Sequence, residues 1–358
     1  MNKYVKRTLK ILGIIAGSIV GIVLIFALVL TIGEYRPDDV EQVELTGQAE
    51  KSLTKGESIT LLSWNIGYGG LSETADFFMD GGKGVRTQDE DQVKKNVQAV
   101  IDTIKEEQPE IVFLQEIDRN STRSYGIDQV QTIGDAYSGY QSGFANNFKV
   151  LYMPIPIPPY GHINSGIMTL SKYSATKAER ISLPCPFSWP LRLLQLKRCL
   201  LVERIPIKDS DKELVLVNLH LEAYDDGEGK VEQTKKLEEL MQTEREKGNY
   251  VIAGGDFNQT FSNIDTGKYP LQSDDVLKCG EIDTSVFDPS WQFCMDTTYP
   301  TCRSLDRPYD RTDEKFQFYV IDGFIVSDNI KVESMETINK DFANSDHNPI
   351  KISFTLSE

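Results

Sequence analysis

The hydrophobic pattern of the chain begins with one long apolar segment. Residues 11–32 contain no charged side chain, and at about 1.5 Å of rise per residue they are long enough to cross a hydrocarbon core of about 30 Å. Basic side chains precede this segment and acidic ones follow it: Lys3, Lys6, Arg7 and Lys10 on one side, Glu34, Asp38 and Asp39 on the other. The positive-inside rule therefore predicts a cytoplasmic N-terminus, residues 1–10, a transmembrane anchor, residues 11–32, and an extracytoplasmic remainder.

A cleaved signal peptide is the alternative interpretation of this segment. A retained anchor is favoured because the apolar run exceeds the usual core of about 7–15 residues and no A-x-A-like site follows it. Residues 33–57 are polar and lack apolar periodicity, which predicts a stalk between the membrane and the domain. Residues 58–358 then form one large domain with no second linker and no internal repeat.

Short apolar runs bounded by turn residues recur through this domain. They are rich in Val, Ile, Leu and Phe, which is typical of strands buried inside a sheet. The runs are residues 59–65, 110–116, 165–171, 213–221, 250–257, 320–327 and 349–354.

Helical periodicity alternates with these runs at two places. Apolar residues recur at helical spacing over 89–107, where Pro109 follows, and over 230–247, which ends at Gly248. Alternating strands and helices predict a layered α/β architecture.

Three segments lie outside this rhythm. The glycine-rich residues 67–87 leave a strand end and are expected to overhang it. The proline-rich residues 150–162 are expected to be an edge or a loop. The aromatic and apolar residues 185–199 are either a hairpin packed on the sheet or a segment that touches substrate or bilayer.

The net charge of the chain bears on which partners it can bind. The chain has a formal charge of −16, and residues 1–33 carry four basic and no acidic groups, so the part beyond the anchor carries −20. This charge disfavours tight nonspecific binding of nucleic acid but does not exclude it, because bound divalent ions reverse the local sign. We expect the protein to act as a monomer.

The five cysteines cannot all pair with one another. In an oxidising compartment the pairs closest in sequence are Cys185 with Cys199 and Cys294 with Cys302, which leaves Cys279 single; five free thiols are the alternative. No cysteine has zinc-ligand spacing with a histidine, so a structural zinc site is not expected.

Polar side chains at the ends of the predicted strands carry the candidate chemistry. Residues from all parts of the domain share this position: Asn65, Glu116, His220, Asp256 with Asn258, and His347. Each one taken singly has a structural interpretation, such as a helix cap, a salt bridge, an Asx turn or a buried histidine. Their recurrence at strand ends instead favours one convergent active site.

Metal-assisted cleavage of a phosphate ester is the chemistry that these groups fit. Hard oxygen ligands suit Mg²⁺ or Mn²⁺, and Glu116 with Asn65 beside it is the leading candidate for the metal side. Asp256 would orient or deprotonate the attacking water, and Asn258, two residues on, would donate to a phosphate oxygen if the strand continues. His220 would stabilise the phosphorus centre or protonate the leaving group.

The motif SDHNP, residues 345–349, supplies the last group. His347 would be a general base or a positively charged phosphate clamp, and Asp346 a second ligand to metal or water. A histidine needs a partner that fixes its tautomer, and Asp322 lies in an apolar strand where an unpaired carboxylate is costly. Asp322 is therefore expected to orient His347.

The ordered motifs WN, LQE, NLH, GGDFN, IDGFIVS and SDHNP resemble the endonuclease/exonuclease/phosphatase, or DNase I-like, superfamily from about residue 58 to 357. The resemblance implies an α/β four-layer sandwich, two packed mixed β-sheets flanked by helices, with a Mg²⁺-dependent phosphoesterase site. It places Asn65, Glu116 and Asp346 on the metal side and gives catalytic roles to His220, Asp256, Asn258, Asp322 and His347. The segment FFMDGGK and residues 301–303 further resemble an uncharacterised bacterial subgroup.

The match departs from the abasic-site endonucleases, because Asn218 and His220 stand where their tyrosine and asparagine pattern is expected. His220 is closer to DNase I and the bacterial sphingomyelinases. Three functions compete: a membrane-anchored phosphodiesterase or phosphatase for lipid headgroups or small phosphoesters, a cell-surface DNase or RNase, and a non-catalytic binding or signalling module. The charge disfavours the second, and the intact motifs disfavour the third.

Overall fold

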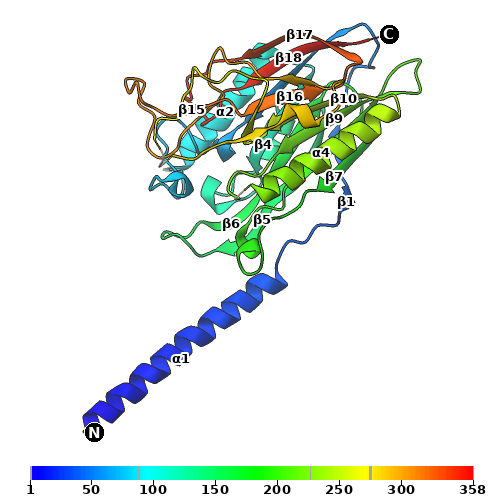
Figure 1. Cartoon of the computed structure of the whole chain (residues 1–358). Helices are drawn as coiled ribbons and strands as arrows, with labels where there is room; N and C mark the ends of the chain where they lie inside the picture. The colour runs from blue at the N-terminus through cyan, green and yellow to red at the C-terminus, as the bar shows by residue number, and fades with distance from the viewer. Residues whose placement is uncertain (1, 88, 226, 274–275, 358) are drawn as a thin grey trace.

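Two packed β-sheets form the centre of the domain (Figure 1). The structure is a computed structural model that describes residues 2–87, 89–225, 227–273 and 276–357. The first sheet contains, in spatial order, β1 (Val40–Gln42), β7 (Lys177–Ser182), β8 (Cys199–Pro206), β9 (Glu213–His220), β10 (Tyr250–Asp256), β16 (Asp322–Val326) and β13 (Gln292–Cys294). The second contains β17 (Ile330–Thr337), β18 (Ile350–Leu356), β3 (Ser58–Asn65), β4 (Ile111–Asp118), β6 (Gly161–Ser171), β5 (Gln141–Met153) and β2 (Leu45–Gly47).

Helices and short elements complete the domain. The helices are α1 (Lys3–Ile32), α2 (Glu90–Glu107), α3 (Gln129–Asp135) and α4 (Glu228–Glu246). Two short strand pairs join β11 (Gln259–Phe261) to β12 (Gly280–Ile282) and β14 (Cys302–Arg303) to β15 (Phe318–Tyr319). The 3₁₀ turns are η1 (Gly67–Gly69), η2 (Phe78–Asp80), η3 (Thr122–Ser124), η4 (Leu191–Leu194) and η5 (Thr284–Val286).

The core has three apolar layers. The inner faces of the two sheets meet in one cluster that includes Phe113 from the second sheet and Phe324 from the first. Leu237 and Met241 of α4 pack on the outer face of the first sheet, and α2 and α3 pack on the outer face of the second. This arrangement confirms the predicted four-layer α/β sandwich.

Two parallel strand pairs decide where the polar strand ends meet. Strands β3 and β4 run parallel, as do β9 and β10, and α2 and α4 make the respective connections. Their apolar sequences follow from burial on both faces. Because parallel strands end at the same edge, Asn65 comes beside Gln115 and Asp256 comes opposite His220.

Local signals account for the boundaries of α2. Asp89 caps the helix by accepting a hydrogen bond from the Gln92 amide at 2.7 Å, and Glu90 and Asp91 suit the positive end of the helix dipole. Gln108 adopts a left-handed conformation at the C-terminus, with φ of 48°, and Pro109 follows. The predicted helices 89–107 and 230–247 agree with α2 and α4 within two residues.

The segment predicted as a polar stalk is attached to the domain instead. Strand β1 pairs with β7 at the edge of the first sheet, and β2 pairs with β5 at the edge of the second. Leu53 is buried in the core between the sheets. Edge strands need few apolar residues, because one side of an edge faces solvent, so composition alone indicated a solvated linker.

Helix α1 projects from the domain (Figure 1). By its length and composition it could cross a membrane, and an N-terminal signal sequence would share these properties. All five cysteines are free thiols, so neither of the two pairs closest in sequence forms a disulfide.

Candidate active site

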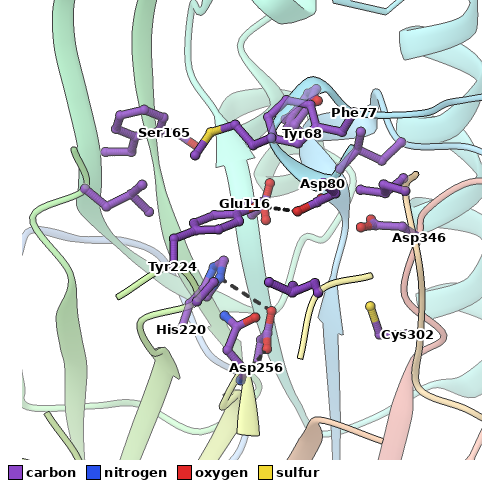
Figure 2. A pocket seen from close by; sticks show the side chains of 18 of the residues that line it. Tyr68, Phe77, Asp80, Glu116, Ser165, His220, Tyr224, Asp256, Cys302 and Asp346 are labelled. Atoms are coloured by element: carbon purple, nitrogen blue, oxygen red, sulfur yellow. Dashed lines mark hydrogen bonds and ion pairs between the residues drawn. The ribbon is translucent and has the colours of Figure 1, made fainter. Parts of the chain in front are cut away.

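A cavity of about 310 Å³ opens at the edge where the parallel strands end. Catalytic candidates from both sheets line it, namely Glu116, His220, Asp256, Asn258, Asp346 and His347. Its walls come from residues 67–87, from 150–162 and from the segment around Cys302 to Leu305. The structure therefore gathers these six predicted residues around one space (Figure 2). Asn65 and Asp322 do not line it but contact Glu116 and His347, which do.

Asn65 does not line this cavity, but it connects residues of the two sheets that do. Its Nδ2 donates to Glu116 Oε1 at 3.2 Å and to Asp256 Oδ2 at 3.0 Å, while its Oδ1 accepts from the Gly67 amide at 3.0 Å. The amide nitrogen thus faces the carboxylates. In this orientation the amide oxygen is bonded to the Gly67 amide, and the amide nitrogen contacts Glu116.

Glu116 reaches the cavity through a bulge in β4. The register with β6 shifts between Leu114 and Ile117, and Glu116 has a φ of 52°. A side chain at positive φ carries a conformational cost, and such residues concentrate at functional sites. The bulge turns the half-buried carboxylate towards the cavity.

Asp256 Oδ2 is the point at which three other candidates meet. Besides Asn65, it has His220 Nε2 at 3.4 Å and His347 Nε2 at 3.7 Å. The side chain is 1 % exposed, and this burial raises the pKa of Asp256 to about 6. A carboxylate that both histidines approach is suited to hold a water molecule or a phosphate oxygen between them.

The strand does not continue through Asn258 as the two-residue spacing suggested. Asn258 has a φ of 52°, its amide donates to Asp256 Oδ1 at 2.8 Å, and its Nδ2 donates to the Leu221 carbonyl at 2.9 Å. Asp256 and Asn258 thus form an Asx turn, which was the structural interpretation considered for them from the sequence. Asn258 nevertheless lines the cavity, so the turn positions both side chains.

His347 is held in one orientation. Its Nδ1 lies 2.8 Å from Asp322 Oδ2, and Trp64 Nε1 donates to its carbonyl at 2.8 Å. Burial by itself would lower the pKa of His347, but the Asp322 carboxylate raises it, and the net pKa lies well above the usual value. The structure thus makes Asp322 the partner of His347, as the apolar strand around Asp322 suggested.

His220 has the opposite electrostatic character. Burial, followed by the positive charge of Arg198, lowers the pKa of His220 well below its usual value. Its Nδ1 is buried with no hydrogen-bond partner. A neutral imidazole donates through one ring nitrogen only, so the two histidines of the site offer one neutral and one charged group. The third histidine, His162, does not line the cavity and lies 3.3 Å from Asn120 Oδ1.

Two further residues face the site although they do not lie at the end of a predicted strand and were not predicted as site residues. Asp80 lies in η2, and Tyr224 donates to its Oδ1 at 3.1 Å (Figure 2). Burial raises the pKa of Asp80 to about 7, and the charges of Asp346 and Glu116 add to the effect. The sequence predicted that residues 67–87 overhang the site, but this segment has no apolar periodicity that would identify Asp80 as the carboxylate facing the cavity.

Arg303 fixes the overhanging segment to the opposite wall. Its Nη2 donates to the Ser72 carbonyl at 2.7 Å and to the Ala75 carbonyl at 3.1 Å. The Phe77 amide adds a bond to the Leu305 carbonyl at 2.8 Å. The roof over the catalytic residues is therefore hydrogen-bonded in place.

The carboxylates of the site fit a hard divalent cation. Burial raises the pKa of Asp346 to about 6, and the nearby Glu116 charge adds to this. Mutually repelling carboxylates around one cavity are stabilised by a cation, and their oxygens suit Mg²⁺ or Mn²⁺. Cys302 Sγ lies within 4.8 Å of ligand atoms of Asp346 and His347, and burial raises the pKa of its thiol to about 12. A soft thiol suits Mg²⁺ or Mn²⁺ less well than carboxylate oxygens do.

Gly255 gives the GGDFN motif its shape. Its φ is 141°, and a Cβ at this position would lie 2.0 Å from the Leu219 carbonyl oxygen. We expect Gly255→Ala to lower the free energy of unfolding by at least about 2 kcal/mol in urea denaturation of the full chain in detergent. Gly134→Ala is the control, because Gly134 lies in α3 with only Met168 Cε near, at 3.7 Å; an equal loss there would contradict the steric argument.

Comparison with known proteins agrees with this geometry. The Endonuclease/Exonuclease/phosphatase family matches residues 62–334. The chain belongs to this family. Family members are hydrolases that act on phosphoesters, and no curated protein sequence matches the chain.

Solved structures share the fold of this endonuclease/exonuclease/phosphatase domain. One from Beutenbergia cavernae is 14 % identical, with a TM-score of 0.56, and covers 84 % of this chain and 72 % of its own. One from Bacteroides vulgatus is 15 % identical, with a TM-score of 0.54 and coverages of 84 % and 100 %. The human Nocturnin catalytic domain with bound sulfate is 15 % identical, with a TM-score of 0.50 and coverages of 88 % and 97 %.

Proposed function

We propose that this protein is a divalent-metal-dependent phosphodiesterase or phosphatase that acts outside the cytoplasmic membrane on lipid headgroups or small phosphoesters. The observation that carries the proposal is the meeting of Asn65, His220 and His347 at one Asp256 oxygen, within 3.0, 3.4 and 3.7 Å. Hydrolysis breaks one P–O bond of the ester, and water supplies the new oxygen on phosphorus and the proton for the leaving oxygen.

Each residue has a role in that reaction. Glu116 and Asp346 would hold Mg²⁺ or Mn²⁺, with Asn65 orienting Glu116; the bound ion would neutralise charge on the nonbridging phosphate oxygens. Asp256 accepts the proton of the attacking water, and Asn258 donates to a phosphate oxygen. The charged His347, oriented by Asp322, clamps the phosphate, and the neutral His220 donates to an oxygen at the phosphorus centre.

The anchor supports the proposed location. Lys3, Lys6, Arg7 and Lys10 precede the apolar part of α1, and basic residues remain on the cytoplasmic side of a membrane span. The domain, which we take to be monomeric, would then lie outside the membrane. The net charge of −20 beyond residue 33 disfavours nucleic acid as the substrate.

Metal removal tests the proposal directly. Purified full-length protein in detergent is offered bis-p-nitrophenyl phosphate, plasmid DNA and choline phospholipids in parallel. We expect EDTA to abolish turnover of the phosphodiesters and Mg²⁺ or Mn²⁺ to restore it, with no nicking of DNA. Glu116→Gln should raise the metal concentration needed for half-maximal activity at least about tenfold, the effect of losing about 1.4 kcal/mol of binding. Turnover that persists in EDTA would contradict the metal assignment, and nicking of DNA alone would favour the nuclease.

A further inference from the structure

One arm of the catalytic cavity has apolar walls. The same cavity that holds Glu116 and Asp256 is also lined by Phe77, Phe148, Met153, Ile155, Leu191 and Leu194. These side chains come from the overhanging segment, from β5 and the loop after it, and from η4. A phosphate group uses only the polar end of such a cavity, so the apolar arm must accommodate another part of the substrate.

The apolar arm ends where α1 joins the domain. The ring of Tyr152, in β5, packs edge-on against Phe26 at 6.4 Å between centroids. Trp189 Nε1, just before η4, donates to Thr31 Oγ1 at 3.2 Å. The end of the domain that carries β5 and β6 lies next to the C-terminal end of α1 (Figure 1). The end of β5 and the segment just before η4 therefore contact the last turns of the apolar helix.

An ion-pair cluster fixes this junction. Glu34, two residues after α1, lies 3.1 Å from Arg192 Nε and 3.4 Å from Lys197 Nζ. Its carboxylate is 3 % exposed, and the neighbouring basic groups together outweigh burial and lower the pKa of Glu34. The loop that carries η4 is thus held at the level where the helix would leave the bilayer.

The rim of the arm is exposed and apolar. Ile155 and Leu191 line the cavity and are 61 % and 62 % exposed. Leu151 at the end of β5, Ile157 in the loop after β5 and Trp189 just before η4 are also exposed. A contiguous apolar rim of this kind is unfavourable in water and favourable in the interfacial region of a bilayer, where tryptophan is enriched.

We propose that the substrate is a membrane amphiphile whose phosphate ester lies at the catalytic residues and whose hydrocarbon tail occupies the apolar arm. The rim at Ile155 and Leu191 inserts into the bilayer that holds α1, and the tail enters the cavity from that bilayer. This inference rests on the proposed phosphoesterase function and adds its substrate class. The position of the rim beside α1 favours a bilayer lipid over a soluble amphiphile.

A chain-length series tests the tail site. The full-length protein in detergent, with Mg²⁺, is offered p-nitrophenyl methyl phosphate and p-nitrophenyl octyl phosphate in separate assays. The two esters share the reacting phosphodiester and the leaving group. Each buried methylene contributes about fourfold to binding, so we expect kcat/KM for the octyl ester to exceed that for the methyl ester by at least about 10²-fold. Hydrolysis of both esters at similar kcat/KM overturns the tail site and leaves the phosphoesterase function standing. No hydrolysis of either ester overturns the phosphoesterase function and the tail site with it.

Rim variants locate the effect. The double variant Ile155→Ser, Leu191→Ser is expected to reduce the ratio of octyl to methyl kcat/KM at least about tenfold. Val286→Ser is the matched control, because Val286 is 67 % exposed and lies in η5, away from the residues that line the cavity. It should leave the ratio unchanged. A ratio that survives in the double variant, or falls equally in the control, overturns the assignment of the tail to this arm.

Reconstitution distinguishes the source of the tail. The full-length protein is placed in vesicles of phosphatidylcholine and phosphatidylglycerol, and lipid phosphorus is followed by ³¹P NMR. We expect Mg²⁺-dependent loss of a lipid phosphodiester signal, slowed at least about tenfold by the double variant. A preference for the octyl ester without turnover of either vesicle lipid overturns the bilayer source and assigns the arm to a soluble amphiphile.

Discussion

We expect His347→Ala to lower kcat for phosphoester hydrolysis by at least about 10²-fold, the scale of a positioned acid–base group. His347 is 4 % exposed, and its Nδ1 and Nε2 lie 2.8 Å from Asp322 and 3.7 Å from Asp256. Removing the ring takes away the only charged imidazole of the site. The measurement is steady-state hydrolysis of bis-p-nitrophenyl phosphate by the full-length protein with Mg²⁺.

His162→Ala is the matched control for this variant. His162 is half-buried and does not line the cavity, so its loss should change kcat less than about twofold. An equal loss in both variants would mean that histidine removal acts through folding. Retention of full activity in His347→Ala would contradict the proposed clamp.

The pH dependence of kcat distinguishes two roles of Asp322, which are to stabilise the charged form of His347 or only to support the fold. Asp322 raises the pKa of His347, so the charged imidazole persists to a higher pH than in a free histidine. Asp322→Asn removes that carboxylate, and the positive charge is then lost at a lower pH. We expect the alkaline limb of kcat to move to lower pH in Asp322→Asn, whereas a purely structural partner would change kcat at every pH alike.

The largest expected loss of stability comes from Arg123. This side chain is 5 % exposed, and its Nε and Nη2 donate to the two oxygens of Asp118 at 3.0 and 2.9 Å. Its guanidinium also stacks 3.7 Å from the centroid of the Tyr68 ring. Removing one partner of a buried ion pair leaves the other charge uncompensated. We expect Arg123→Met to lower the free energy of unfolding by about 3–5 kcal/mol.

An exposed ion pair provides the control. Arg245 lies 2.6 Å from Asp328, with side chains 29 % and 47 % exposed, and such pairs contribute at most about 1 kcal/mol. Urea denaturation in detergent, followed by tryptophan fluorescence, measures both Arg123→Met and Arg245→Met. A loss below about 1 kcal/mol in Arg123→Met would show that Asp118 is compensated by its other neighbours.

Local patterns along the chain predicted a layered α/β fold and favoured convergence of the polar strand ends, whereas the four-layer sandwich was implied by the family resemblance. The apolar runs ending at Asn65, His220 and Asp256 became buried strands of two parallel pairs, β3 with β4 and β9 with β10. Periodicity predicts such strands because burial on both faces demands continuous apolar side chains. The strands themselves therefore followed from the sequence, whereas their parallel pairing, which brings the carboxyl ends to one edge, was seen only in the structure.

Turn geometry and edge pairing were harder to predict. Asn258 turned away from the strand direction into a left-handed conformation, and residues 40–42 and 45–47 joined the sheet edges although their composition indicated a linker. In both cases the backbone hydrogen bonds depend on a partner far away in the chain, and composition carries no information about that partner.

The sequence by itself determined the long apolar N-terminal helix, the layered fold and the set of strand-end polar residues, because each depends on the spacing of side chains within one element. Only the tertiary structure placed Asp80 and Tyr224 at the site and joined Ile155 to Leu191 around an apolar arm beside α1. These groups lie on loops without periodicity, and long-range packing against other loops decides their positions.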